Sequence, residues 1–146
     1  MEMKNNYFTD AEFEHSYTAE NRGISNKMTP AIKAKWRAFR SDILNPLRED
    51  WGSALIVTSG YRCAKLNSVV GGSKTSAHLQ GEAIDLIPKN GDTTGFFEFT
   101  KWWLLRKEKR FDQLIWENDG ENWWVHIGYR NNLGFQRGEI KSLKKG

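Results

Sequence analysis

The spacing of apolar residues predicts one long helix in the first third of the chain. Its first turn begins at Thr29, and Pro30 follows at a position where a missing N–H costs nothing. We expect Pro46 to end or kink this helix and Gly52 to stop it. The positions of its buried stripe, separated by four, three, four and four residues, are Ile32, Trp36, Phe39, Ile43 and Leu47.

Three further helices are expected. Thr9 and Glu12 have the spacing of a capping box, which predicts a short helix near the N-terminus. A brief helix over residues 63–70 is closed by Gly71 and Gly72. A longer one covers residues 93–107, and the side chains able to face the core from it are Phe96, Phe99, Trp103 and Leu104.

Four strands are expected where apolar runs are bounded by turn-forming residues. The first is expected to be a buried strand, and the last two are joined by the turn Asn118-Asp119-Gly120. Because helices dominate the first half and strands the second, the pattern predicts an α+β fold with a small, mainly antiparallel sheet and helices packed on it. The four strands cover residues 54–58, 83–87, 111–116 and 123–129.

Length and composition exclude several classes of protein. The 146 residues suit a single domain over 1–146, and 38% apolar with 27% charged residues argues against disorder. A single cysteine, Cys63, excludes an internal disulfide. No apolar run is long enough to cross a membrane, and residues 1–6 do not begin a secretory signal. We therefore expect a protein made in the cytoplasm, with no membrane partner.

The formal net charge of +4 favours an anionic partner, such as nucleic acid or bacterial cell wall. Nucleic acid is not expected, because the chain has no basic helix and no glycine-and-aromatic RNA motif. Three lysines near the C-terminus are expected to form a solvated tail rather than a binding patch: Lys141, Lys144 and Lys145.

Two of the three histidines lie in or near strands. His15 is expected at the surface, but His78 precedes Asp85 by seven residues, with Gly81 between them to turn the chain. A carboxylate in an apolar strand is costly unless a cation or hydrogen bonds stabilise it. On this segment alone, a metal site and an Asp85 that accepts hydrogen bonds from backbone or His78 are equally good interpretations.

His126 favours the metal site, because it is the one polar side chain in a second apolar strand. Strand alternation puts Trp124, His126 and Gly128 on one face of that strand. Two imidazoles and one carboxylate leave a fourth position open, the pattern of catalytic zinc. The same ligand types occur in non-haem Fe(II) oxygenases, but there the histidine and the acid are typically two residues apart.

Several segments form a set that is far more specific than a lone histidine–aspartate pair. They are Asn45-Pro46-Leu47-Arg48, Thr58-Ser59-Gly60-Tyr61-Arg62, Gly71-Gly72-Ser73-Lys74-Thr75-Ser76, the pattern Ser76-x-His78-x-x-Gly81-x-Ala83-x-Asp85, Phe111-Asp112-Gln113-Leu114-Ile115-Trp116-Glu117 and Trp124-Val125-His126. Together these segments resemble the zinc D-Ala-D-Ala carboxypeptidases of peptidase family M15, in its phage and bacterial branch, to which the hedgehog signalling domain is similar in fold. The resemblance extends over residues 7–129.

The resemblance implies one zinc ion per chain, bound by His78, Asp85 and His126. It also implies cleavage of peptide bonds in peptidoglycan stem peptides, by a carboxypeptidase or an endolysin-type endopeptidase. Arg62 corresponds to the arginine that engages substrate and developing oxyanion charge, and Glu117 to the general base. The chain is expected to act as a monomer at the bacterial cell wall, after phage lysis or as part of a virion.

The chain departs from the family at the catalytic acid. Many members place it three residues before the last histidine, where this chain has Trp123. Glu117 is preferred to Asp119 and Glu121, because one branch and the hedgehog domain use the earlier position. Hedgehog domains also supply the alternative function, a zinc-loaded binding module without catalysis.

Two other residues are candidates for substrate binding. Ser76 could orient a ligand or line the pocket, although a turn residue needs no function. Trp123 could form a stacking wall for sugar or peptide, whereas Trp116 is expected to pack in the core.

Overall fold

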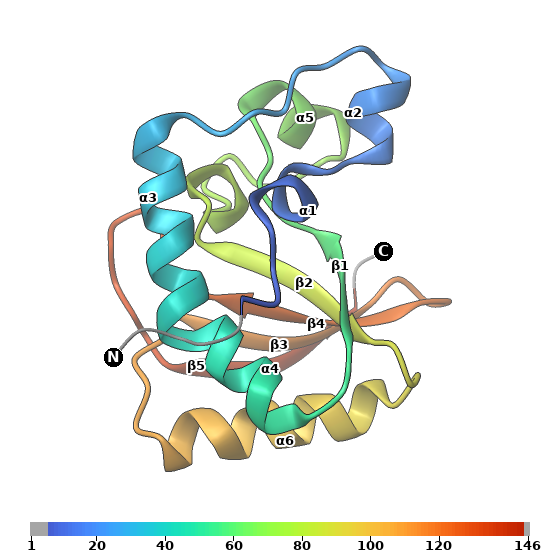
Figure 1. Cartoon of the computed structure of the whole chain (residues 1–146). Coiled ribbons are helices and arrows are strands. Elements are labelled where there is room, and N and C mark those ends of the chain that lie inside the picture. Colours follow the sequence, from blue (N-terminus) through green and yellow to red (C-terminus); the bar gives the residue numbers. More distant parts are fainter. Residues whose placement is uncertain (1–5, 145–146) are drawn as a thin grey trace.

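The computed structural model describes residues 6–144, which form one five-stranded sheet with helices around it (Figure 1). The strand order is β1-β2-β4-β3-β5, and every neighbouring pair is antiparallel except β3 and β5, which are parallel. The predicted α+β class and mainly antiparallel sheet are therefore confirmed. The strands are β1 (Leu55–Ser59), β2 (Ala83–Pro88), β3 (Gln113–Asn118), β4 (Trp123–Gly128) and β5 (Glu139–Lys144).

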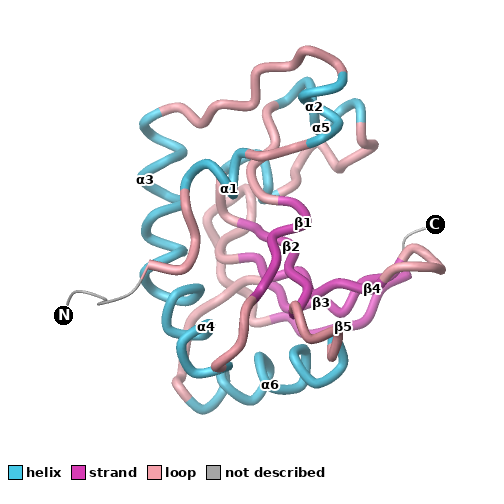
Figure 2. Tube along the Cα trace, turned by 45° about the vertical axis from the view of Figure 1, so that its right-hand side comes forward, coloured by secondary structure: helices cyan, strands magenta, loops and turns pink. Residues whose placement is uncertain are grey.

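Helices α1, α2 and α5 gather at one end of the sheet, whereas α3 and α4 follow its side and α6 lies beneath it (Figures 1 and 2). No helix in the described part of the chain is long and apolar enough to cross a membrane. The helices are α1 (Asp10–Glu14), α2 (Tyr17–Asn21), α3 (Pro30–Phe39), α4 (Asn45–Trp51), α5 (Ala64–Val69) and α6 (Thr93–Arg106).

The predicted caps form as expected. Thr9 and Glu12 make the complete capping box of α1, and the Thr29 side chain accepts a hydrogen bond from the backbone of α3. Pro46, however, does not end the long helix: a π-helical segment, Arg40–Leu44, connects α3 to α4. Extra residues in a helical turn are one way of accommodating a proline, which has no N–H to donate. Gly52 then ends α4 in a left-handed conformation.

One face of the sheet packs on α6 and forms much of the core. Helix α6 contacts β2, β3 and β4, and its Phe96, Trp103 and Leu104 are almost fully buried. Val125 and Ile127 of β4 belong to the same core cluster. Since side chains alternate along a strand, His126 points to the opposite face, which is therefore the face available for a site.

The structure corrects three expectations about strands. β1 is an edge strand with alternating exposure, not a buried one. β3 continues to Asn118, because Glu117 and Asn118 pair with β4. The C-terminal lysines do not form a solvated tail, since Lys141 and Lys144 belong to strand β5, while Lys145 lies outside the described residues.

Candidate metal centre

The sheet register aligns the two strand residues of the predicted metal site. Asp85 on β2 pairs directly with His126 on β4, and Ile115 on β3 pairs with the other side of His126. Directly paired residues of neighbouring strands share a face of the sheet. The alignment therefore brings a carboxylate and an imidazole together, although 41 residues separate them in the chain.

His78 reaches the same place from a short 3-10 helix, Ala77–Gln80, that precedes β2. Ser76 begins this helix, and its Oγ accepts a hydrogen bond from the backbone N–H of His78 at 3.2 Å. Gly81 ends it with φ of +70°, a conformation that other residues rarely adopt, and the chain then turns into β2. The predicted role of Gly81 in folding His78 back toward Asp85 is confirmed.

The hydrogen bonds of His78 determine which ring nitrogen faces the site. Its Nδ1 lies 2.7 Å from the carbonyl oxygen of Gly60, and a carbonyl can only accept, so Nδ1 carries the proton. The lone pair of Nε2 then points at Oδ1 of Asp85, 3.5 Å away. A lone pair that faces a carboxylate oxygen is the arrangement expected of two ligands to one cation.

The three side chains form a compact, buried group. His126 Nδ1 lies 2.9 Å from Asp85 Oδ1, and one ligand atom from each of His78, Asp85 and His126 lies within 4.8 Å of the others. As the residues stand, Nδ1 of His126 donates its proton to the Asp85 carboxylate, and a metal ion would replace that proton. The donor set is therefore chemically suited to a metal, and two imidazoles with one carboxylate are ligands that zinc accepts.

The charge states of these residues favour cation binding. Burial lowers the pKa of the His78 imidazole, although the charge of Asp85 acts in the opposite direction, and the neutral ring is the form that binds metals. Burial raises the pKa of Asp85, but its interactions with the two neighbouring histidines, the hydrogen bond from His126 among them, outweigh burial and hold the pKa below its usual range. Asp85 is therefore an ionised ligand at neutral pH.

Glu117 lies beside this group on β3. It is 1% exposed, and its Oε1 is 3.5 Å from His126 Nδ1. The indole N–H of Trp124 donates to the same oxygen at 3.3 Å. The other two candidate acids, Asp119 and Glu121, are exposed in the β3–β4 turn and do not line the site. Only Glu117 of the three is in reach of the metal group.

Arg62 approaches from the other side, between β1 and α5. Its Nη1 donates to Oδ1 of Asn67 at 2.9 Å, and Asn67 is itself buried and donates to the carbonyl of Ser73. Burial lowers the pKa of the Arg62 guanidinium, whereas the charges of Asp85 and Glu117 raise it. Asn67 thus positions Arg62. Its role could not be predicted from the sequence, because one asparagine in a short helix has no recognisable spacing.

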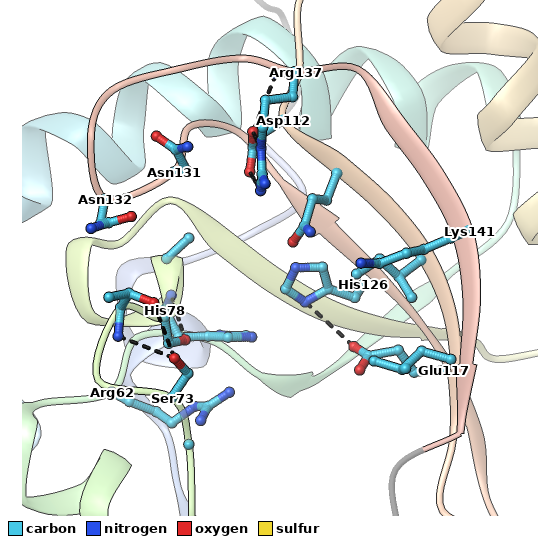
Figure 3. Close-up of a pocket in the computed structure, with 17 residues that line it drawn as sticks. Arg62, Ser73, His78, Asp112, Glu117, His126, Asn131, Asn132, Arg137 and Lys141 are labelled. Atoms are coloured by element: carbon cyan, nitrogen blue, oxygen red, sulfur yellow. Dashed lines mark hydrogen bonds and ion pairs between the residues drawn. The ribbon is translucent and has the colours of Figure 1, made fainter.

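These residues open into one cleft of about 340 Å³ on the free face of the sheet (Figure 3). Arg62, Ser76 and Glu117 all line it together with both histidines, so Ser76 does lie in the pocket wall as well as capping its helix. In Figure 3 His126 lies between Arg62 and His78 on one side and Glu117 and Lys141 on the other. The cleft is therefore polar on both sides of the metal group.

Trp123 does not contribute to this cleft. It pairs with Asn118, on the face of the sheet that carries α6, and its ring lies 4.5 Å from that of Trp116. Trp116 in turn stacks on Phe97 of α6. The expectation that Trp123 forms a wall of the site is thus not supported, since strand alternation places its neighbour Trp124 on the site face instead.

A buried His-Asp-His group, with a further carboxylate and an arginine on the cleft wall, has the side chains of a metal-dependent hydrolase. The chain belongs to the peptidase M15 family, because the family model described as Peptidase M15 matches residues 6–127. The protein is therefore a metallopeptidase, and the resemblance noted from the sequence is confirmed. Comparison with curated proteins found no match.

Proposed function

We propose that the protein is a zinc-dependent peptidase that cleaves peptidoglycan stem peptides. The observation that carries this proposal is the closeness of Glu117 Oε1, at 3.5 Å, to a buried group of two histidines and an aspartate. His78 Nε2, Asp85 Oδ1 and His126 Nδ1 would hold the ion. When bound, zinc would lower the pKa of a water molecule and polarise the scissile carbonyl.

Glu117 is the residue proposed to move the proton. Its carboxylate lies beside the metal group without belonging to it, and from this position it would accept the proton of the attacking water. The indole N–H of Trp124 donates to Oε1 and fixes the direction of the side chain. The protonated Glu117 then delivers the proton to the leaving amine, which completes the cleavage of the peptide bond.

Arg62 is proposed to bind the substrate carbonyl as negative charge develops on its oxygen. A guanidinium is permanently charged and offers several donors in a fixed plane. Nη1 is occupied by Asn67, and the Nε atom is buried with no hydrogen-bond partner. Asn67 therefore holds one end of the guanidinium in place on the wall of the cleft, which Arg62 lines.

Stem peptides are the proposed substrates for two reasons. The resemblance to D-Ala-D-Ala carboxypeptidases and phage lysins implies them, and the formal charge of +4 suits the anionic polymers of a bacterial cell wall. The protein would then act at the cell wall, after phage lysis or within a virion. The rival proposal, a hedgehog-like binding module, is disfavoured by the buried Glu117, which metal binding alone does not require.

Digestion of purified muropeptides with mass analysis of the products tests the proposal. We expect cleaved stem peptides from the zinc-loaded protein, no cleavage after treatment with a chelator, and recovery when zinc is restored. A zinc-loaded protein that binds stem peptides without cleaving them would support the binding module instead. A protein that neither binds nor cleaves them would contradict the proposed substrate.

Replacement of Gly72 by alanine tests the role of Arg62 without changing the arginine. A Cβ at Gly72 would overlap the amide oxygen of Asn67 and lie 2.5 Å from Arg62 Nη1, so the pair must move. Because a displacement of about 1 Å costs roughly a hundredfold in rate, we expect a loss of that order in kcat with zinc binding retained. Steady-state kinetics with a stem peptide measures this. Ser68→Ala, on the exposed side of α5, is the control, and equal activity of the two variants would exclude the role.

A further inference from the structure

Strand β5 adds a lysine to the cleft from beyond the part of the chain that matches the family model. The match ends at residue 127, and β5 covers Glu139–Lys144. Lys141 pairs with Ile115 of β3, which pairs with His126 of β4. Lys141 is thus two strand spacings, about 10 Å, from His126 in the same row across the sheet. Figure 3 shows its side chain extending over the sheet toward His126.

The position of β5 is maintained by buried and partly buried contacts. Just before the strand, Arg137 donates from Nε and Nη2 to the two carboxylate oxygens of the buried Asp112, at 2.8 and 2.9 Å. At its first residue, Glu139 accepts a hydrogen bond from Gln113 Nε2 at 2.7 Å. These contacts hold the first residues of β5 against the start of β3, and so they determine where Lys141 lies.

The ammonium group of Lys141 has capacity for another anion. Its Nζ pairs with Glu139 Oε1 at 3.0 Å, and the side chain is 43% exposed. Ion pairs at such exposure contribute little to stability, and an ammonium has three donors. Arg137 differs, because the buried Asp112 neutralises it with two hydrogen bonds. Two cationic side chains therefore lie on opposite sides of the metal group. Lys141 lies on the side of β5, and Arg62 lies on the side of α5.

We propose that Lys141 determines substrate specificity by binding a carboxylate of the stem peptide on the β5 side of the metal group. This inference rests on the proposed function. Stem peptides carry several carboxylates, among them the α-carboxylate of a γ-linked glutamate, and bacteria can convert such groups to carboxamides. A carboxylate forms charge-assisted hydrogen bonds with an ammonium, whereas a carboxamide brings no charge. Lys141 therefore favours the unamidated form of one carboxylate.

A set of synthetic stem peptides tests the inference. One peptide has all its carboxylates free, and each of the others has a single carboxylate converted to a carboxamide. For the wild-type protein we expect one of these changes to lower kcat/KM about tenfold, the lower end of the range for a hydrogen bond to a charged group. Lys141→Gln should lose this discrimination through a higher KM for the parent peptide, at unchanged kcat.

Lys144→Gln is the matched control, because it removes the same charge from the same strand. Leu143 and Lys141 line the cleft, so strand alternation places Lys144 on the other face of β5. This variant should discriminate among the peptides as the wild-type protein does. Lys141→Arg, which keeps the charge, should retain most of the discrimination.

Equilibrium binding supplies a readout that does not depend on turnover. In a Glu117→Gln background, calorimetry should show about tenfold weaker binding of the parent peptide when Lys141→Gln is added. The role of Lys141 is overturned if the single variant Lys141→Gln binds and cleaves every peptide as well as the wild-type protein does. It is also overturned if kcat/KM of Lys141→Gln falls by the same factor for all the peptides. If the wild-type protein cleaves none of the peptides, the proposed function itself fails, and Lys141 has no stem peptide to select.

Discussion

Glu117→Gln should lower kcat by roughly 10²- to 10⁴-fold, the usual contribution of general acid–base catalysis. Glutamine has the same shape and can still accept the indole hydrogen bond from Trp124, but it cannot take a proton from water. The variant should therefore bind zinc and unfold at the same temperature as the wild-type protein. Steady-state kinetics, metal analysis and thermal unfolding of the same preparation measure the three quantities.

The matched control is Glu121→Gln, which removes the same charge a few residues further along. Glu121 is exposed in the β3–β4 turn and does not line the cleft. Its replacement should leave turnover close to that of the parent. The opposite pattern, with Glu121→Gln inactive and Glu117→Gln active, would show that the choice of base is wrong.

His78→Ala should abolish hydrolysis, because it removes one of the three proposed ligands. It should also abolish the stabilisation that zinc gives the folded state. A ligand that binds only the folded protein raises the free energy of unfolding by about 2.7 kcal/mol at a hundred times its dissociation constant. The rise in Tm on addition of zinc, seen in the wild-type protein, should thus be absent in the variant.

His15→Ala serves as the control for that experiment. His15 follows α1, and its side chain is 43% exposed and pairs with Glu20, away from the cleft. Turnover and the zinc-dependent rise in Tm should both be retained. If His78→Ala retains both turnover and the zinc-dependent rise in Tm, His78 is not a ligand of the metal.

The local parts of the fold could be predicted from the sequence, and the parts that depend on distant pairing could not. The caps of α1 and α3 involve residues three positions apart, so their side chains appear directly in the sequence. Strand β5 was missed because β3, its partner in the sheet of residues 6–144, lies more than twenty residues away and pairs with it in parallel. Charged residues in β5 are compatible with an edge strand, which has one unpaired side.

The metal group was predictable because Asp85 and His126 interrupt apolar strands, where polar side chains are costly, and because Gly81 lets the chain fold His78 back toward Asp85. The residues around it had no such signal. Asn67 positions Arg62 from a short helix, and Lys141 belongs to an unrecognised strand. Strand alternation puts Trp124, not Trp123, on the face of His126, but the hydrogen bond from Trp124 to Glu117 also depends on the register of β4 with β3, which the sequence does not show.

The central claim is that His78, Asp85 and His126 bind one zinc ion, and the metal content of purified His126→Ala protein tests it most directly. Elemental analysis of the wild-type and His15→Ala proteins should give one zinc per chain after removal of loosely bound metal. The His126→Ala protein should contain essentially none, because two remaining ligands bind zinc weakly. Full zinc occupancy in His126→Ala would contradict the assignment of this site.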